Sequence, residues 1–344
     1  MTTPALPSPS EVSRRQVLAS GGAALGAAAL SACGTVSQAS GPASAPVGGS
    51  QSASDAKGFR YRTVDINGLS VFVREAGDAS APTLLLLHGF PSSSFMYREL
   101  MDALKDEFHV IAPDYPGFGH SSAPLRGEWP YTFEAITDVV DALTERLGLE
   151  RYALYVQDYG APVGFRLATR HPERITGIVT QNGNAYEQGL TPLWAPIRAL
   201  WANRNDAAAE AAVRGIFTRE FRKMEHTTGI KDPSRINPDA MLLDQLLLER
   251  PGIADVQLDL FYDYRTNVAA YPEWQASLRK HQPPLLAVWG KNDPGFAPEG
   301  ALAFKQDVPN AAVHLVDSGH FALEDHGEVI AAHVRGFLRR ISRV

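Results

Sequence analysis

Apolar and polar positions follow two different periods along most of the chain after residue 59. Short, nearly continuous apolar runs bounded by Gly, Asp or Pro predict strands that are buried on both faces. These runs lie at residues 71–73, 83–87, 110–112, 152–156, 175–180, 285–289 and 313–316. Between them, apolar residues recur at the helical period, most clearly over residues 133–147 and in a last helix near residues 328–341. The pattern predicts an α/β fold, with a mostly parallel sheet flanked by helices.

This alternation stops between residues 182 and 284, where helical patterns continue but no convincing strand occurs. A helical segment inserted into an α/β sheet is typical of a cap or lid. We therefore expect a core made of residues 59–181 and 285–344, with a helical cap formed by residues 182–284.

The N-terminal residues have a different pattern. The pair Arg14-Arg15 precedes a weakly apolar stretch over residues 17–30, which is too short to span a bilayer stably. This arrangement resembles a twin-arginine export signal. The following Leu30-Ser31-Ala32-Cys33 resembles a lipoprotein processing site. The resemblance implies that residues 1–32 are removed.

Cys33 would then become the lipidated N-terminus of the mature protein, and its acyl chains would anchor the protein to a membrane. Residues 33–58 are rich in Ser, Ala, Gly and Pro and lack a periodic apolar pattern. Such a segment predicts a flexible linker. We therefore expect an exported lipoprotein on the cell envelope or the periplasmic side of a membrane.

Composition excludes several other classes of protein. Hydrophobic residues make up 44% of the chain and charged residues 20%, which is a globular balance. The 32 Lys and Arg residues and the 38 Asp and Glu residues give a formal net charge of -6. The sequence has no basic stripe that would indicate a nucleic-acid partner. The single cysteine excludes an intrachain disulfide framework and makes a cysteine-rich zinc site implausible.

Loops that follow predicted strands carry residues typical of catalysis. The motif Gln157-Asp158-Tyr159-Gly160 stands between a strand and a helical pattern, where an α/β-hydrolase places its nucleophile elbow. Asp293 follows the run at 285–289, and His320 follows the last predicted strand. Since open α/β sheets build their sites at the carboxyl ends of strands, we expect these side chains to lie together. Their order matches the hydrolase triad of nucleophile, acid and histidine.

Asp158 by itself would be ambiguous, because an aspartate before a helix is a common N-cap. In addition, Val156 occupies the position where the common motif has its first glycine. A third motif changes the balance: His88-Gly89-Phe90-Pro91 ends an earlier strand, where hydrolases carry a backbone donor of the oxyanion hole.

On these three motifs, with Gly319-His320-Phe321 around the histidine, residues 59–344 resemble the α/β-hydrolase superfamily. Within it, they resemble the branch of epoxide hydrolases and haloalkane dehalogenases that use an aspartate nucleophile.

The resemblance implies a role for each residue. Asp158 would attack an sp³ carbon of a small apolar organic substrate and form an alkyl ester, which water activated by His320 would hydrolyse. Asp293 would orient the imidazole and stabilise its charged form. The backbone N–H groups of Phe90 and Tyr159 would form the oxyanion hole. No metal or organic cofactor is implied.

Epoxide hydrolases of this branch use cap tyrosines to give a proton to the ring oxygen. Tyr264, in Asp263-Tyr264-Arg265-Thr266-Asn267, resembles one of them. The second donor would come from the first half of the cap, where Trp201 and Tyr186 are candidates. An indole N–H donates a hydrogen bond but cannot give up its proton.

Dehalogenases of this branch hold the halide with a tryptophan directly after the nucleophile and with a second donor elsewhere. Here Tyr159 follows the nucleophile and Phe90 follows His88-Gly89, so Trp194 or Trp201 is the candidate halide contact. Plain packing in the cap is the alternative role for these aromatic residues and for Tyr264.

Epoxide hydrolysis is therefore the first hypothesis and haloalkane dehalogenation the second. A third hypothesis, from another class, is a non-catalytic protein that uses the fold as a ligand-binding shell. Retention of all three triad positions argues against it. The sequence leaves the physiological substrate and the oligomeric state open.

Overall fold

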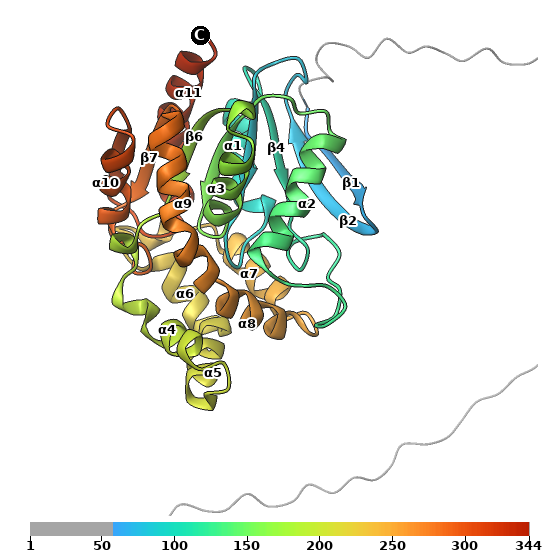
Figure 1. The fold of residues 1–344 in the computed structure, drawn as a ribbon, viewed down its shortest axis with the longest axis vertical. Coiled ribbons are helices and arrows are strands. Elements are labelled where there is room, and N and C mark those ends of the chain that lie inside the picture. Colours follow the sequence, from blue (N-terminus) through green and yellow to red (C-terminus); the bar gives the residue numbers. More distant parts are fainter. Residues whose placement is uncertain (1–57, 344) are drawn as a thin grey trace, which may run out of the picture. The chain divides into compact units, whose positions relative to one another are not determined.

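A mixed sheet of eight strands runs through the centre of residues 58–343, the part of the chain that the computed structural model describes. The strand order is β1-β2-β4-β3-β5-β6-β7-β8, with β2 antiparallel to both β1 and β4 and all other neighbours parallel (Figure 1). The strands are β1 Arg60–Ile66, β2 Leu69–Ala76, β3 Thr83–Leu87, β4 His109–Pro113, β5 Tyr152–Gln157, β6 Ile175–Gln181, β7 Leu285–Gly290 and β8 Ala312–Val316. The predicted α/β class is confirmed.

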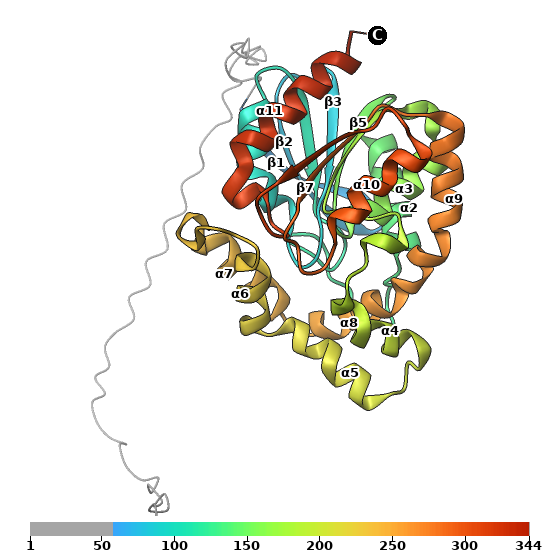
Figure 2. The same ribbon diagram turned by 90° about the vertical axis from the view of Figure 1, so that its left-hand side faces the viewer.

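Helices cover both faces of this sheet, because successive side chains of a strand point to opposite faces. In β3, Leu84 and Leu86 belong to the core cluster that contains residues of α1 and α11, whereas Leu85 and Leu87 belong to the cluster that contains residues of α2, α3, α9 and α10. Figure 2 shows α11 on one side of the sheet and α2, α3, α9 and α10 on the other. These helices are α1 Arg98–Leu104, α2 Phe133–Arg146, α3 Gly160–Arg170, α9 Arg265–His281, α10 Pro298–Asp307 and α11 Leu323–Ile341.

Two elements differ from what the apolar patterns predict. Every predicted apolar run is a strand, but β1 lacks such a run because it is an edge strand with most of its side chains exposed or half-buried. The last helix begins at Leu323 rather than near residue 328, and its first turn is separated from the rest by a non-helical residue, His326. That interruption, followed by Gly327, hides the first turn from a periodicity argument.

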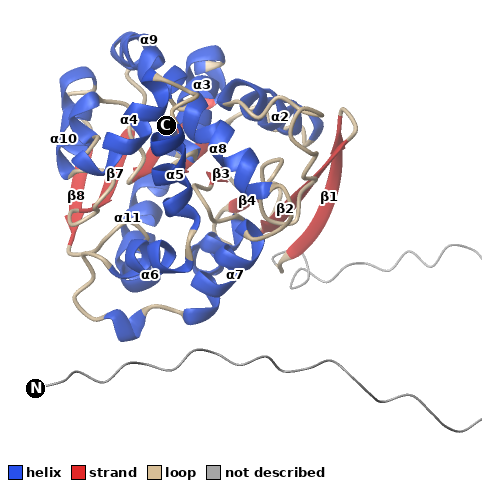
Figure 3. Cartoon of the chain, turned by 90° about the horizontal axis from the view of Figure 1, so that it is seen from below, coloured by secondary structure: helices blue, strands red, loops and turns tan. Residues whose placement is uncertain are grey.

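Five helices between β6 and β7 gather below the carboxyl ends of the parallel strands (Figures 2 and 3). They are α4 Ala195–Ala202, α5 Ala207–Arg214, α6 Arg219–Thr227, α7 Pro238–Leu248 and α8 Ile253–Asp263. The next helix, α9, returns along the core, where the ring of Trp274 stacks on Phe165 of α3 at 5.8 Å between centroids. The insertion thus forms a helical cap over one edge of the sheet.

The export signal predicted over residues 1–32 and the lipidation site Cys33 lie outside the described residues, as does nearly all of the linker, so these stay predictions. Within residues 58–343, none of the helices combines the length and the apolar character needed to cross a membrane.

Candidate active site

Asp158 lies on a sharp turn between β5 and α3. Its φ is 47°, a left-handed conformation that is strained for a residue with a side chain and is often found at functional sites. Gly160 begins α3, and a Cβ at this position would overlap the carbonyl oxygen of Leu87. The close approach of α3 to β3 therefore requires glycine here, and Asp158 occupies the expected strand–turn–helix position.

The valine at position 156 is accommodated from within α3. A Cβ on Gly164 would overlap Cγ1 of Val156, so the missing side chain at Gly164 makes room for the valine. The common motif creates this space with a glycine two residues before the nucleophile. Here Gly164, six residues after Asp158, creates it. The departure from the motif therefore leaves the turn intact.

The loop after β3 holds the carboxylate of Asp158. The backbone N–H of Phe90 donates to Oδ1 of Asp158 at 2.7 Å, and the backbone N–H of Tyr159 also bonds this carboxylate. Gly89 allows the approach, because a Cβ there would overlap Cβ of Asp158. The two backbone donors expected from the sequence therefore converge on one side chain.

His320 and Asp293 form a buried pair on the loops after β8 and β7. Nδ1 of His320 lies 2.8 Å from Oδ2 of Asp293, and the backbone N–H of Gly295 donates to Oδ1 of Asp293 at 2.7 Å. The other imidazole nitrogen, Nε2, faces Nε2 of Gln157 at 2.8 Å. The imidazole thus has its Nδ1 directed to the acid and its Nε2 directed to the nucleophile turn.

Burial and charge shift the pKa of both reactive groups. Burial raises the pKa of Asp158, although the charge of His320 and the two backbone N–H groups act in the opposite direction. Burial alone would lower the pKa of His320, but the charge and hydrogen bond of Asp293, with the charge of Asp158, raise it. Titration of one group therefore changes the state of the other.

A small cavity of about 50 Å³ lies over Asp158 and His320. It is closed mainly by apolar cap residues, and its other polar side chains are Asp293, Glu225 and Tyr159. The apolar members are Phe90, Leu193, Trp194, Ile197, Ile216, Phe221, Met224, Phe261 and Phe296. Such an apolar pocket with few convergent polar groups is typical of a site for a small organic ligand.

The cap aromatics predicted to contact substrate lie in different places. Trp194 lines the cavity, but its indole N–H donates to the carbonyl of Gly295 at 2.9 Å. Trp201 and Tyr264 do not line it: the indole of Trp201 donates to the Phe261 carbonyl at 2.7 Å, and the Tyr264 ring is parallel to that indole at 6.2 Å. Both rings pack behind the cavity wall.

A buried arginine brings positive charge to the cap side of the site. Arg222 of α6 is completely buried, with Cζ 5.1 Å from the ring centroid of Phe90. Burial lowers its pKa to about 10, so the guanidinium stays charged at neutral pH. It forms an ion pair with Glu225, which lines the cavity.

Two further polar side chains of the site were not predicted to be functional. Asn182 follows β6, and its Nδ2 donates to Oδ2 of Asp293 at 2.7 Å and to the Gly290 carbonyl at 3.2 Å. Gln157 faces His320, as described above. Both stand at the carboxyl end of a strand, and Gln157 also precedes Asp158 in the motif, but neither position by itself indicates a role. His88 and Asp114, in contrast, shape loops: His88 accepts from the Tyr115 N–H, and Asp114 accepts from the Ser94 N–H.

We expect Asn182→Ala to lower both stability and activity. The change removes three hydrogen bonds and leaves alanine at a φ of 46°, so the free energy of unfolding should fall by about 2–4 kcal/mol. Asn182→Gly removes the same bonds without left-handed strain, so its free energy of unfolding should fall less. Both variants should lose turnover, by about 10-fold, because Asp293 loses a donor. Urea unfolding with steady-state assays checks this, and an unchanged turnover would contradict it.

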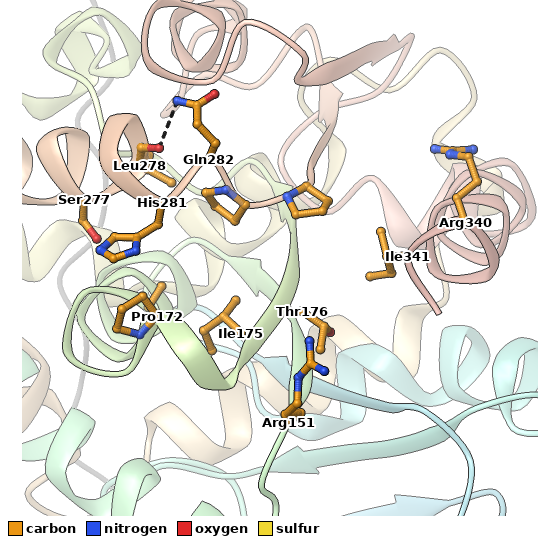
Figure 4. Close-up of a pocket in the computed structure, with 13 residues that line it drawn as sticks. Arg151, Pro172, Ile175, Thr176, Ser277, Leu278, His281, Gln282, Arg340 and Ile341 are labelled. Carbon is orange, nitrogen blue, oxygen red and sulfur yellow. Dashed lines mark hydrogen bonds between the residues drawn. The ribbon is translucent and has the colours of Figure 1, made fainter. Parts of the chain in front are cut away.

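A second cavity, of about 400 Å³, lies at the opposite edge of the sheet, near the amino ends of β5, β6 and β7 (Figure 4). Arg151, Thr176, His281 and Arg340 are among its lining residues. No acidic side chain lines it, and none of the predicted site residues does. No group of three metal-ligating side chains occurs within residues 58–343. The carboxylates and the histidine predicted for the site therefore do not belong to this second cavity.

Comparison with known proteins agrees with this geometry. The model of the alpha/beta hydrolase fold family matches residues 82–327. An uncharacterised hydrolase of Saccharomyces cerevisiae, YNR064C, is 41% identical over 279 residues, covering 80% of this chain and 96% of that protein. A cis-3-alkyl-4-alkyloxetan-2-one decarboxylase of Shewanella oneidensis is 32% identical, covering 74% and 81%. Haloalkane dehalogenase 2 of Mycobacterium tuberculosis is 28% identical, covering 75% and 88%.

The chain belongs to the α/β hydrolase fold family. It is a hydrolase of this fold that is similar to haloalkane dehalogenases.

Proposed function

We propose that this hydrolase releases halide from short haloalkanes through an alkyl ester of Asp158. The observation that carries the proposal is the small apolar cavity in which a backbone-held carboxylate and a histidine–aspartate pair meet. A carboxylate held in this way is suited to attack a carbon electrophile, and the histidine beside it is suited to activate water. The similarity to haloalkane dehalogenases supports the choice of substrate.

In the first step, one oxygen of Asp158 attacks the carbon that carries the halogen. The Phe90 N–H already occupies Oδ1, which leaves Oδ2 as the attacking atom. The new C–O bond forms as the carbon–halogen bond breaks, and the halide leaves with the bonding electron pair. Tyr159 lines the cavity and its hydroxyl has no hydrogen-bond partner within residues 58–343, so this hydroxyl is our candidate donor to the halide.

In the second step, His320 takes a proton from water, whose oxygen attacks Cγ of the Asp158 ester. The backbone donors of Phe90 and Tyr159 stabilise the resulting oxyanion, and the buried charge of Arg222 favours it electrostatically. The Cγ–O bond to the alkyl group then breaks, and the alcohol leaves with the proton from His320. The regenerated carboxyl of Asp158 carries one oxygen and the second proton of the water. Loss of this proton to solvent restores the carboxylate and balances the halide released in the first step.

Haloalkanes are better supported than epoxides, which the sequence ranked first. Opening an epoxide requires a proton donor for the ring oxygen. Tyr264, the cap tyrosine expected to supply it, does not line the cavity. Among the described residues this leaves Tyr159 as the one tyrosine there, in place of the two cap donors that the resemblance implies for an epoxide hydrolase. A halide needs only a hydrogen-bond donor, because it leaves as a stable anion.

The small size of the cavity favours short substrates. About 50 Å³ is room for only a few water-sized groups, so long chains require movement of the cap. Under this proposal, kcat/KM should fall as the alkyl chain is lengthened.

A panel of matched substrates tests the proposal. Each 1-bromoalkane from two to six carbons is paired with the epoxide of the same length, and halide ion and diol are measured separately. Halide release that is fastest for the short chains supports the proposal. Diol formation without halide release would assign epoxide hydrolysis instead. The formation of neither product from any member of the panel would refute both assignments.

The two half-reactions should depend differently on pH. Alkylation needs ionised Asp158, so it should be lost only as the pH falls through the raised pKa of this carboxyl. Ester hydrolysis needs neutral His320, so as the pH falls it should be lost at a higher pH than alkylation. Because ester formation removes the Asp158 charge that raises the pKa of His320, this pKa should be lower in the alkyl-enzyme than in the free enzyme.

Single-turnover rapid quench from about pH 4 to 9 measures each rate. Coincident acidic limbs for alkylation and hydrolysis would contradict this expectation.

A further inference from the structure

Gln157, the last residue of β5, has a completely buried side chain between the nucleophile and the base. Its Nε2 lies 2.8 Å from Nε2 of His320. Its Oε1 has no hydrogen-bond partner within the described part of the chain. A Cβ on Gly89 would overlap both this oxygen and Cβ of Asp158, so Oε1 lies beside the nucleophile. The two ends of one amide therefore flank the place where water must attack.

We infer that Gln157 is a positioning residue for the second half-reaction, in which it holds His320 as a base and orients the attacking water. The inference rests on the proposed function and adds Gln157, a residue that the two proposed steps do not themselves require. An amide N–H can donate to Nε2 only when that nitrogen carries no proton. The bond therefore favours the imidazole whose single proton is on Nδ1, toward Asp293.

Water that enters between Nε2 of His320 and Cγ of the ester displaces the amide from Nε2, since this nitrogen has one lone pair. The water then has two O–H groups to direct. His320 accepts one, and the free Oε1 of Gln157 accepts the other, which leaves a lone pair of the water oxygen for Cγ. A buried amide oxygen without a partner is unfavourable, and the water supplies that partner.

His320 is faced by three charged groups: Asp293, Asp158 and Arg222. Gln157→Glu keeps the size of the side chain but adds a fourth charge, which stabilises the imidazolium. Gln157→Met removes the hydrogen bond to Nε2 and the proposed bond to water, and adds no charge. The pH at which ester hydrolysis is half lost should therefore rise from the wild type to Gln157→Met and further to Gln157→Glu. A side chain that only filled space would not produce this order.

Rapid-quench mass spectrometry of the full chain with a short 1-bromoalkane tests the inference. Gln157→Met should slow hydrolysis of the ester by about 10-fold or more, so that the ester accumulates, and should slow alkylation less than about 3-fold. The matched control is Gln257→Met, which removes a buried glutamine of α8 that does not line the cavity. Both of its rates should equal those of the wild type.

Equal slowing of the two half-reactions, or an acidic limb that does not move, would overturn the inference. If the Met variant fails to fold, the shift of the acidic limb in Gln157→Glu decides alone. Failure of the proposed function gives a different result: no ester then forms even in His320→Gln. Ester formation in His320→Gln with wild-type hydrolysis in the Gln157 variants would refute the positioning role only.

Discussion

Replacing His320 by glutamine is expected to stop turnover while Asp158 still reacts, so that the alkyl ester accumulates on the protein. Glutamine is close to imidazole in size but cannot take a proton from water, and a general base contributes about 10²–10⁴-fold. Turnover should therefore fall by at least about 10³-fold, whereas alkylation should fall much less. Intact-mass spectrometry measures the adduct: a haloalkane adds its alkyl group without the halogen, and an epoxide adds its whole mass.

The control for this experiment is His314→Gln, on β8, which should turn over like the wild type and accumulate no adduct. Peptide mapping should place the adduct on Asp158. An adduct on another residue, or none with any substrate that the wild type converts, would contradict the assignment of the nucleophile.

Replacing Asp158 by alanine is expected to lower kcat/KM by at least about 10⁴-fold. Without the carboxylate no ester forms. The remaining His320–Asp293 pair can then only activate water for direct attack on the substrate, which is itself not activated. Halide release measured at high enzyme concentration quantifies the loss, and circular dichroism shows whether the fold is retained.

Asp102→Ala, which removes an exposed carboxylate of α1, should keep wild-type activity. Halide release that survives in Asp158→Ala would show that another group is the nucleophile. It would also remove the basis for the inference about Gln157.

The strands could be predicted because a strand buried on both faces requires a nearly continuous apolar run. β5 and β7 are completely buried and were recognised from such runs. β1 is an edge strand with exposed side chains, and no apolar run marks it. Local burial therefore decided which strands could be found in the sequence.

The same reasoning explains which parts of the site could be predicted. Asp158, Asp293 and His320 follow strands directly, and the carboxyl ends of parallel strands meet at one edge of the sheet. Their proximity therefore follows from the fold class alone. The compensation between Val156 and Gly164 could not be predicted, because it depends on how closely α3 packs on β5.

The cap shows where sequence-based inference reached its limit. Trp194, Trp201 and Tyr264 are equally plausible contacts in the sequence, but only Trp194 lines the cavity. Which face of a cap helix points to the nucleophile depends on contacts with segments far away in the chain. The bond from the Trp201 indole to the Phe261 carbonyl is one such contact.

The sequence by itself therefore determined the fold class, the position of the turn at Asp158 and the meeting of Asp158, Asp293 and His320 at one edge of the sheet, because each follows from a local pattern next to a strand. Only the tertiary structure decided the size of the cavity, its lining and the roles open to Gln157 and Asn182. These features depend on distances between side chains from different strands and loops, which no local pattern encodes.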